Sequence, residues 1–290
     1  MSASLAALPA PYALSDTLLG GQAFRWTPAR GGFEGFIGNA PARLTPARGG
    51  LLVESAAEGD PVRAAEAYLR VSDDLRRIYR SIGKDPRIRR ATRRWKGLHL
   101  LAQEPWEALI AFTASSASNV PKISRSLEKV ARAFGKPVAF RGKAWHAFPS
   151  PRALARADLA GLRRCELGYR ARYIRSTAQR VAEGQVDLGA IAKMPTAEAQ
   201  AALVEAFDGT GPKVAACVLL FSMGRDDAFP VDRWVQRCLS EWYFEGKPLS
   251  LRRCQAWGRE TFGRHAGYAQ QYLFHERRSR GRLPRARAAL

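Results

Sequence analysis

Apolar residues follow two different spacings along the chain, and the change falls near Ala64. Before it, short apolar stretches such as residues 33–37 and 51–53 are separated by turns such as residues 48–50. Short apolar runs bounded by turn signals are typical of strands in a small antiparallel sheet. After Ala64, apolar residues recur at the period of a helix. The pattern therefore predicts an α+β protein, with a small β domain followed by a larger helical domain.

The clearest predicted helix covers residues 120–134. Its apolar face consists of Ile123, Leu127, Val130, Ala131 and Phe134. Asn119 stands where a side-chain N-cap is expected, and the Gly-Lys-Pro sequence at residues 135–137 stops the helix. The same spacing predicts further helices over residues 100–116, 151–164, 169–183, 196–207, 213–223, 232–244, 250–262 and 265–277.

We expect three parts in the chain: a β domain over residues 1–64, a helical domain over residues 65–276 and a disordered tail over residues 277–290. The tail holds six arginines and no acidic residue. A solvated tail of this composition adds nonspecific affinity for DNA.

The chain is strongly basic. Lys and Arg number 47 against 26 Asp and Glu, which gives a net charge of +21 and a pI near 10.7. Such an excess indicates a polyanionic partner, with nucleic acid as the first candidate. A ribosome-associated protein, or a basic protein with no specific partner, fits the charge equally well. The apolar content of 46% is enough to build folded cores and excludes a disordered chain.

The four cysteines give no sign of a metal site. Cys165, Cys217, Cys238 and Cys254 form no Cys-x-x-Cys pair, so we expect neither zinc nor an iron–sulfur cluster, and no organic cofactor. The first basic residue is Arg25, and no apolar run approaches the roughly 18 residues of a membrane span. We therefore expect an intracellular protein with no signal peptide and no membrane contact.

The most informative stretch is the turn between two predicted helices at residues 207–217. Gly209 and Gly211 flank Thr210, and Pro212 opens the next helix, which gives a helix-hairpin-helix. Backbone amides in such a turn approach a DNA phosphate closely, although Gly-x-Gly turns also join helices that bind nothing. Lys213 lies in the first turn of the new helix, where the helix dipole disfavours an ammonium. A lysine that loses its proton acts as a nucleophile.

Asp232 stands at the start of the next predicted helix. Val235, Leu239 and Trp242 give that helix a buried stripe, so the simplest interpretation of Asp232 is an ordinary N-cap. A carboxylate that faces the amine of Lys213 across a cleft also suits cleavage of an N-glycosidic bond. It stabilises the sugar cation that forms as the base leaves, and it helps the amine to attack C1′.

This pair belongs to a series of motifs in a fixed order. The series comprises Gly21-Gln22-Ala23-Phe24-Arg25-Trp26, Phe148-Pro149-Ser150, residues 167–173, the hairpin with Lys213 and Cys217, Pro230-Val231-Asp232, and Ala266-Gly267-Tyr268-Ala269-Gln270 followed by Phe274. Over nearly its whole length the chain resembles the 8-oxoguanine DNA glycosylases, the lysine-bearing branch of the helix-hairpin-helix glycosylase superfamily. The resemblance implies that Lys213 forms a Schiff base with the sugar, that Asp232 supports it, and that the strand is then cut by β-elimination.

The resemblance also implies a pocket for the extruded base. The carbonyl of Gly21 accepts the N7 proton that 8-oxoguanine has and guanine lacks; guanine would leave two acceptors facing each other, at a cost of about 1–3 kcal/mol. Gln270 reads the Watson–Crick edge, while Cys217 and Phe274 sandwich the ring. From the residues alone, Cys217 and Phe274 could equally belong to the core, and Gln270 could be a surface amide.

On the DNA side, Tyr169 resembles the wedge that enters the base stack, and Arg170 lies beside it near the opposite strand. Three positions depart from the family pattern. Ala117 stands in the loop 115–119, which ends at Asn119 and matches a run of asparagines in the family. Lys122 replaces an arginine, and Trp234 replaces a histidine. Ala117 offers no side-chain hydrogen bond, and Lys122 lacks the guanidinium fork that reads cytosine.

We expect catalysis to be preserved and opposite-base recognition to be relaxed, or redirected to another damaged purine. The first hypothesis is a bifunctional glycosylase and lyase that acts as a monomer on damaged duplex DNA. A monofunctional glycosylase that removes alkylated bases with a water activated by Asp232 is the second hypothesis. The third is a non-catalytic binder of bent DNA.

Overall fold

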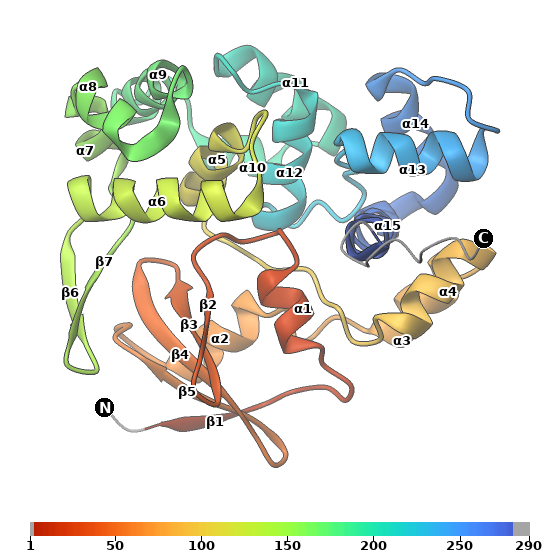
Figure 1. Ribbon diagram of the computed structural model, residues 1–290, viewed down its shortest axis with the longest axis horizontal. Helices are drawn as coiled ribbons and strands as arrows, with labels where there is room; N and C mark the ends of the chain where they lie inside the picture. Colours follow the sequence, from red (N-terminus) through yellow and green to blue (C-terminus); the bar gives the residue numbers. More distant parts are fainter. Residues whose placement is uncertain (1–2, 281–290) are drawn as a thin grey trace, which may run out of the picture.

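The computed structural model describes residues 3–280, and these form a small sheet beside a larger helical body (Figure 1). The sheet has five strands in the order β1-β5-β4-β3-β2, and all its pairings are antiparallel. The strands are β1 (Ser4–Ala7), β2 (Thr27–Ala29), β3 (Gly32–Ile37), β4 (Ala40–Ala47) and β5 (Gly50–Ser55), with α1 (Leu14–Leu19) between β1 and β2. The predicted α+β class, with the sheet first, is confirmed.

The sheet buries one face because its apolar residues alternate. Ala42 and Leu44 of β4 and Leu51 and Val53 of β5 are fully buried, and Leu44 is paired with Val53. The core under this face also includes Ala65, Tyr68, Leu69 and Leu101, which come after the strands in the sequence. The sheet is therefore held against the segment that leads into the helical body.

Fourteen further helices follow in the described part of the chain. They are α2 (Pro61–Tyr68), α3 (Leu75–Ile82), α4 (Pro86–Arg94), α5 (Pro105–Ala114), α6 (Val120–Phe134), α7 (Pro151–Arg156), α8 (Leu159–Leu162), α9 (Arg170–Ala182), α10 (Leu188–Lys193), α11 (Thr196–Ala206), α12 (Pro212–Ser222), α13 (Arg233–Tyr243), α14 (Leu251–Phe262) and α15 (Ala266–Arg280). A π turn (Arg163–Leu167) precedes α9, and a 3₁₀ turn (Gly263–His265) precedes α15.

Two helices form the centre of the helical body. Almost every residue of α5 is buried, and α12 is buried from Val214 to Phe221. A helix that is apolar on all sides belongs inside a core, and α12 packs against both α5 and α11. This packing brings the first turn of α12 close to the end of α5, which is where the functional residues meet.

The observed helices differ from the predicted ones at several ends. The helix predicted over 100–116 begins only at Pro105, because the side chain of Glu104 accepts hydrogen bonds from the first-turn amides and proline suits that turn. The helix predicted over 151–164 is divided into α7 and α8. Residues 277–280, predicted as the start of a disordered tail, belong to α15, which continues to Arg280; the rest of the predicted tail, residues 281–290, lies outside the described residues.

A short hairpin was not predicted at all. Strands β6 (Pro137–Phe140) and β7 (Lys143–His146) pair through a turn at Arg141 and Gly142, which both have positive φ. The ring of Trp145 packs against that of Phe36, and Arg141 pairs with Glu54. The hairpin thus connects the helical body to the sheet. From residue 3 to residue 280, no helix has both the length and the hydropathy that a membrane crossing requires.

Candidate active site

Lys213 lies in the first turn of α12 with its amine turned toward the end of α5. Its Nζ donates a hydrogen bond of 3.1 Å to Oγ of Ser115 and lies 5.3 Å from the centre of the Phe112 ring. The side chain is half-buried. The start of α12 follows from the local sequence, because Gly211 supplies an extended N-cap and Pro212 occupies the first helical position.

Asp232 is the N-cap of α13, as predicted. Its Oδ1 accepts a hydrogen bond of 2.8 Å from the amide of Val235. Burial raises the pKa of Asp232 above its ordinary value, while the Val235 amide and the positive charge of Lys213 act in the opposite direction. The carboxylate therefore lies in a poorly solvated place within the electrostatic reach of the amine.

Cys217 belongs to the same cluster. It lies one turn after Lys213 on α12 and is 4% exposed. Burial raises the pKa of the Cys217 thiol; Lys213 lowers it and the charge of Asp232 raises it further. Lys213, Cys217 and Asp232 therefore lie within electrostatic reach of one another.

Gly21 and Phe274 lie against each other. Gly21 has φ of +89°, and a Cβ built on it would lie 3.1 Å from Cε1 of Phe274. A larger residue would meet both a strained backbone and the aromatic ring. Gln271 and Arg278 donate hydrogen bonds to the carbonyls of Gly20 and Leu19, at 3.4 and 3.3 Å. These bonds hold α15 against the loop that carries Gly21.

Gln270 is buried on the same helix. It is 4% exposed, and its Oε1 has no hydrogen-bond partner among residues 3–280. A buried acceptor without a partner costs on the order of 1–3 kcal/mol, so proteins seldom keep one without a reason. An amide of this kind beside Phe274 is typical of a site that a ligand completes.

The hairpin glycines have different roles. Gly209 has φ of +78°, and a Cβ there would come within 2.6 Å of the ring of Tyr173. At Gly211 a Cβ would meet no atom within 4 Å, so the approach to the first turn of α12 is open. An open helix N-terminus with small residues around it is suited to a phosphate.

Two large aromatic side chains of the expected DNA surface are exposed. Tyr169, just before α9, is 53% exposed and Trp234, in the first turn of α13, is 43% exposed. Asn119 accepts a hydrogen bond of 3.0 Å from the amide of Lys122, so its side chain caps α6, while the side chain of Lys122 is exposed. The cap at Asn119 is the one that the sequence predicts.

Arg170 lies beside Tyr169, as the sequence predicts, with its guanidinium carbon 4.5 Å from the centre of the Tyr169 ring. Its side chain is 6% exposed; its Nε donates a 2.7 Å hydrogen bond to the carbonyl of Ser116, and its Nη2 donates a 3.1 Å bond to the carbonyl of Ala117. In this conformation Arg170 braces the loop at residues 115–119 and does not extend from the surface. The loop needs a brace, because Ala117 has φ of +48°, which is unfavourable for alanine.

Sequence reasoning missed two neighbours of the amine, Ser115 and Phe112. Ser115 was noted only as part of the loop that replaces the family's asparagines. Its contact with Lys213 joins residues 98 positions apart, which no local pattern reveals. The available signal was the abrupt end of the apolar run 108–114 at two serines, since a polar residue that ends a fully buried helix faces an opening or a partner.

The chain matches two protein families. Residues 5–109 match the N-terminal domain of 8-oxoguanine DNA glycosylase, and residues 110–253 match the HhH-GPD superfamily of base excision DNA repair proteins. A probable N-glycosylase/DNA lyase of Methanothermobacter thermautotrophicus is 36% identical over 212 residues, which cover 66% of this chain and 67% of that protein.

Two solved structures are similar over almost the whole chain. MBOgg1 in complex with a low-affinity DNA ligand is 30% identical with a TM-score of 0.89, and the match covers 97% of this chain and 100% of that one. The 8-oxoguanine glycosylase/lyase of Clostridium acetobutylicum, in complex with duplex DNA that has cytosine opposite 8-oxoguanine, is 29% identical with a TM-score of 0.88 over 93% of each chain. The fold, the ordered motifs and the matched families agree, and the chain belongs to the 8-oxoguanine DNA glycosylase family of the HhH-GPD superfamily.

Proposed function

We propose that this protein is a bifunctional DNA glycosylase and lyase that removes 8-oxoguanine from duplex DNA. The observation that carries the proposal is the position of the Lys213 amine, which is held at Ser115 beside Cys217 and Asp232. The relatives named N-glycosylase/DNA lyase support the same activity.

Lys213 is the nucleophile in this mechanism. Its neutral amine attacks C1′ of a nucleotide flipped out of the duplex, the C1′–N bond breaks, and the base leaves with the bonding electrons and takes up a proton. The carboxylate of Asp232 stabilises the positive charge that develops on the sugar. Loss of a proton from C2′ of the resulting Schiff base expels the 3′ phosphate, and water then releases Lys213.

The base pocket lies between α12 and α15. Gly21 would accept the N7 proton of 8-oxoguanine, Gln270 would bond to the Watson–Crick edge, and Cys217 and Phe274 would enclose the ring. The unpartnered Oε1 of Gln270 supports this assignment. Phe274 lies against Gly21, so the ring and the carbonyl would contact neighbouring parts of the same base. A high thiol pKa keeps Cys217 neutral, which suits contact with an aromatic ring.

The duplex would lie over the exposed ends of several helices. Gly209 and Gly211 would bind a phosphate, Tyr169 would fill the stack, and Trp234 would contact the strand near the lesion. Arg170 would act by holding the loop at residues 115–119.

The opposite base would be read weakly, because Ala117 and Lys122 replace the side chains that select cytosine. Asn119 would act there mainly through its cap on α6. We expect the protein to work as a monomer, without metal or organic cofactor, as a DNA-associated intracellular enzyme.

Borohydride trapping tests the chemistry. The wild type, Lys213→Gln and the control Lys143→Gln, an exposed residue of the β6–β7 hairpin, are incubated with a duplex that contains 8-oxoguanine. We expect a covalent protein–DNA adduct with the wild type and the control, and none with Lys213→Gln. Free base released by Lys213→Gln at the wild-type rate would instead support a monofunctional glycosylase, and binding without base release would support a non-catalytic binder.

A further inference from the structure

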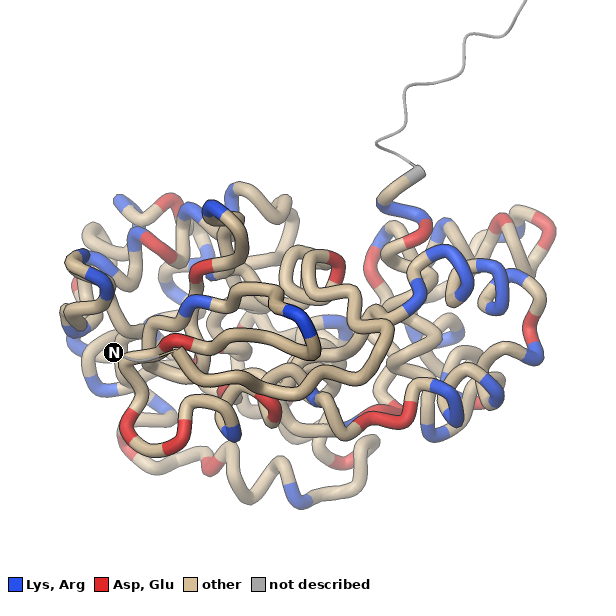
Figure 2. Tube along the Cα trace, turned by 90° about the horizontal axis from the view of Figure 1, so that it is seen from below, with Lys and Arg blue, Asp and Glu red and all other residues tan. Residues whose placement is uncertain are grey.

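Helices α3 and α4 carry a concentration of positive charge that the proposed catalytic site does not use. Residues 75–96 hold ten Lys or Arg and one acidic residue, Asp85, which gives this segment a charge of +9 out of +21 for the chain. Lysine and arginine positions crowd at the end of the molecule where α3, α4, α13 and α14 lie (Figures 1 and 2). So dense a positive surface repels itself unless an anion binds it.

A groove between the two helices collects part of this charge. It has a volume of about 550 Å³, and five of its eight lining residues are cations while none is acidic. The five are Arg80, Lys84, Arg89, Arg93 and Lys96, and all are exposed. None of them forms an ion pair with a carboxylate of residues 3–280.

Two neighbouring arginines outside the groove, Arg87 and Arg94, are exposed but have partners. The guanidinium of Arg87 lies 4.9 Å from the centre of the Tyr243 ring, and Arg94 pairs with Glu276 at 3.3 Å. Arg87 and Arg94 thus have a partner in the helical body, whereas the five cations of the groove have no carboxylate partner among residues 3–280.

Helix α15 separates the groove from the base pocket. Phe274 faces Gly21, whereas Tyr272 bonds to the hydroxyl of Tyr79 at 2.7 Å, and Glu276 accepts a 2.8 Å hydrogen bond from Trp95 of the α4 end. Residues two positions apart on a helix point in nearly opposite directions. A duplex engaged at the pocket therefore lies on the other side of α15 from the groove.

We propose that the α3–α4 groove is a second binding site for duplex DNA, which contacts the phosphates of a separate segment without reading sequence. Arg89 and Arg93 lie four positions apart on one side of α4, about 6 Å along its axis, and Lys96 lines the same groove just beyond the end of the helix. One DNA strand presents about two phosphates over about 6 Å of duplex axis, and Lys96 adds a cation for a third. The choice of DNA over another polyanion rests on the proposed function.

The lining suits a phosphate backbone better than a nucleotide. A nucleotide site needs an aromatic plane or an amide for the base, and the one aromatic ring of the lining belongs to Tyr79. Its hydroxyl is already bonded to Tyr272 and to the amide of Gly97. With two DNA sites, the protein passes from one segment to another without leaving DNA completely.

Capture of a second duplex tests the proposal. An undamaged duplex is immobilised, the full-length protein is added at low salt, and retention of a fluorescent undamaged duplex is measured together with retained protein. The test variant is Arg89→Gln/Arg93→Gln/Lys96→Gln. The control variant, Arg48→Gln/Arg63→Gln/Lys143→Gln, removes the same charge from exposed residues elsewhere.

We expect the wild type and the control to capture the second duplex, and the groove variant to capture at least about fivefold less per retained protein, with a salt dependence reduced by two to three phosphate contacts. Equal capture by the groove variant, or an equal loss in the control, overturns the proposal. The measurement uses undamaged DNA, so it does not depend on Lys213. If borohydride trapping fails while second-duplex capture persists, the proposed function fails and the groove remains a DNA site.

Discussion

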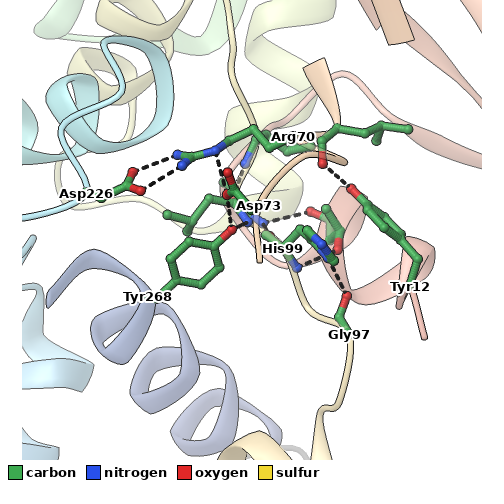
Figure 3. A network of polar contacts seen from close by, with 12 residues as sticks. Tyr12, Arg70, Asp73, Gly97, His99, Asp226 and Tyr268 are labelled. Atoms are coloured by element: carbon green, nitrogen blue, oxygen red, sulfur yellow. Dashed lines mark hydrogen bonds and ion pairs between the residues drawn. The ribbon is translucent and has the colours of Figure 1, made fainter. Parts of the chain in front are cut away.

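Arg70 donates two parallel hydrogen bonds of 2.7 Å each to the carboxylate of Asp226, which lies 156 positions later in the sequence (Figure 3). Arg70 follows α2, beside the sheet, and Asp226 lies in the loop between α12 and α13 that ends at the N-cap Asp232. The backbone carbonyl of Asp226 also accepts a hydrogen bond from the amide of Gly267 at the start of α15. One bidentate pair thus connects the β-sheet side of the molecule to the loop that positions the carboxylate of the active site.

Breaking this pair should lower stability and catalysis together. We expect Arg70→Gln and Asp226→Asn each to reduce the free energy of unfolding by about 1–3 kcal/mol, because each breaks the bidentate pair in a poorly solvated place. Asp226→Asn should cost less, since Arg70 keeps its ion pair with Asp73 at 2.9 Å. Urea unfolding of both single variants and the double variant measures the coupling. The single-turnover excision rate should fall in the same order as stability. Additive losses in the double variant would show that the two residues do not act as a pair.

The pH dependence of the excision rate should follow the protonation of the Asp232 carboxyl. Burial raises the pKa of this carboxyl, so its charged form is lost at a higher pH than for an ordinary aspartate, and the excision rate should fall as pH falls through that raised value. Asp232→Asn should lose excision while keeping most of its stability, since asparagine is an equally good N-cap. Single-turnover rates and thermal unfolding from pH 4 to pH 8 separate the two effects. An acid limb that persists unchanged in residual Asp232→Asn activity would assign it to another group.

Glu107 should make the protein less stable as pH rises toward neutrality. Its side chain lies beside Arg25 and is 18% exposed, and this partial burial raises the pKa of the carboxyl from 4.5 to about 7, with Arg25 opposing the shift. Between these two values the folded state holds a proton that the unfolded chain has lost, so the free energy of unfolding declines by up to about 3 kcal/mol over that range. Urea unfolding at pH 5, 6, 7 and 8 should show this decline in the wild type and its loss in Glu107→Gln.

Opposite-base selection should increase when the two departures from the family pattern are reversed. We expect the wild type to excise 8-oxoguanine opposite cytosine, adenine, guanine and thymine with little discrimination. Ala117→Asn/Lys122→Arg should favour cytosine by about tenfold or more, since one bidentate contact discriminates by about 1–3 kcal/mol. Asparagine also tolerates the positive φ of residue 117 better than alanine. A wild type that already prefers cytosine sharply would refute the idea of relaxed recognition.

The local sequence was sufficient to predict which residues lie at the starts of α12 and α13. Lys213 and Asp232 were placed correctly because a glycine-proline turn and an acidic N-cap fix where α12 and α13 begin. The assignment of Gly21 and Phe274 to one pocket came instead from the family resemblance, and their direct contact was not predicted. The β6–β7 hairpin was missed because its strands are only four residues long and the proline at their start was interpreted as a helix stop.

The contacts that the sequence did not reveal join distant segments. Arg170 is turned inward because two carbonyls of a loop more than fifty positions away lie above α9, and Ser115 meets Lys213 only after α5 and α12 have packed. Hydrophobic spacing predicts that two helices pack, but it does not specify which polar groups meet at their ends. These groups determine how the amine of the site is held.

The contact between Phe274 and Gly21 brings the ring that would cover the base next to the carbonyl that would test its N7 position. In the proposed pocket, a guanine packed against Phe274 would place its N7 lone pair opposite that carbonyl. The same contact that favours the damaged base would then disfavour the intact one, so the commonest base in the search would be rejected without any change in the reactivity of the amine.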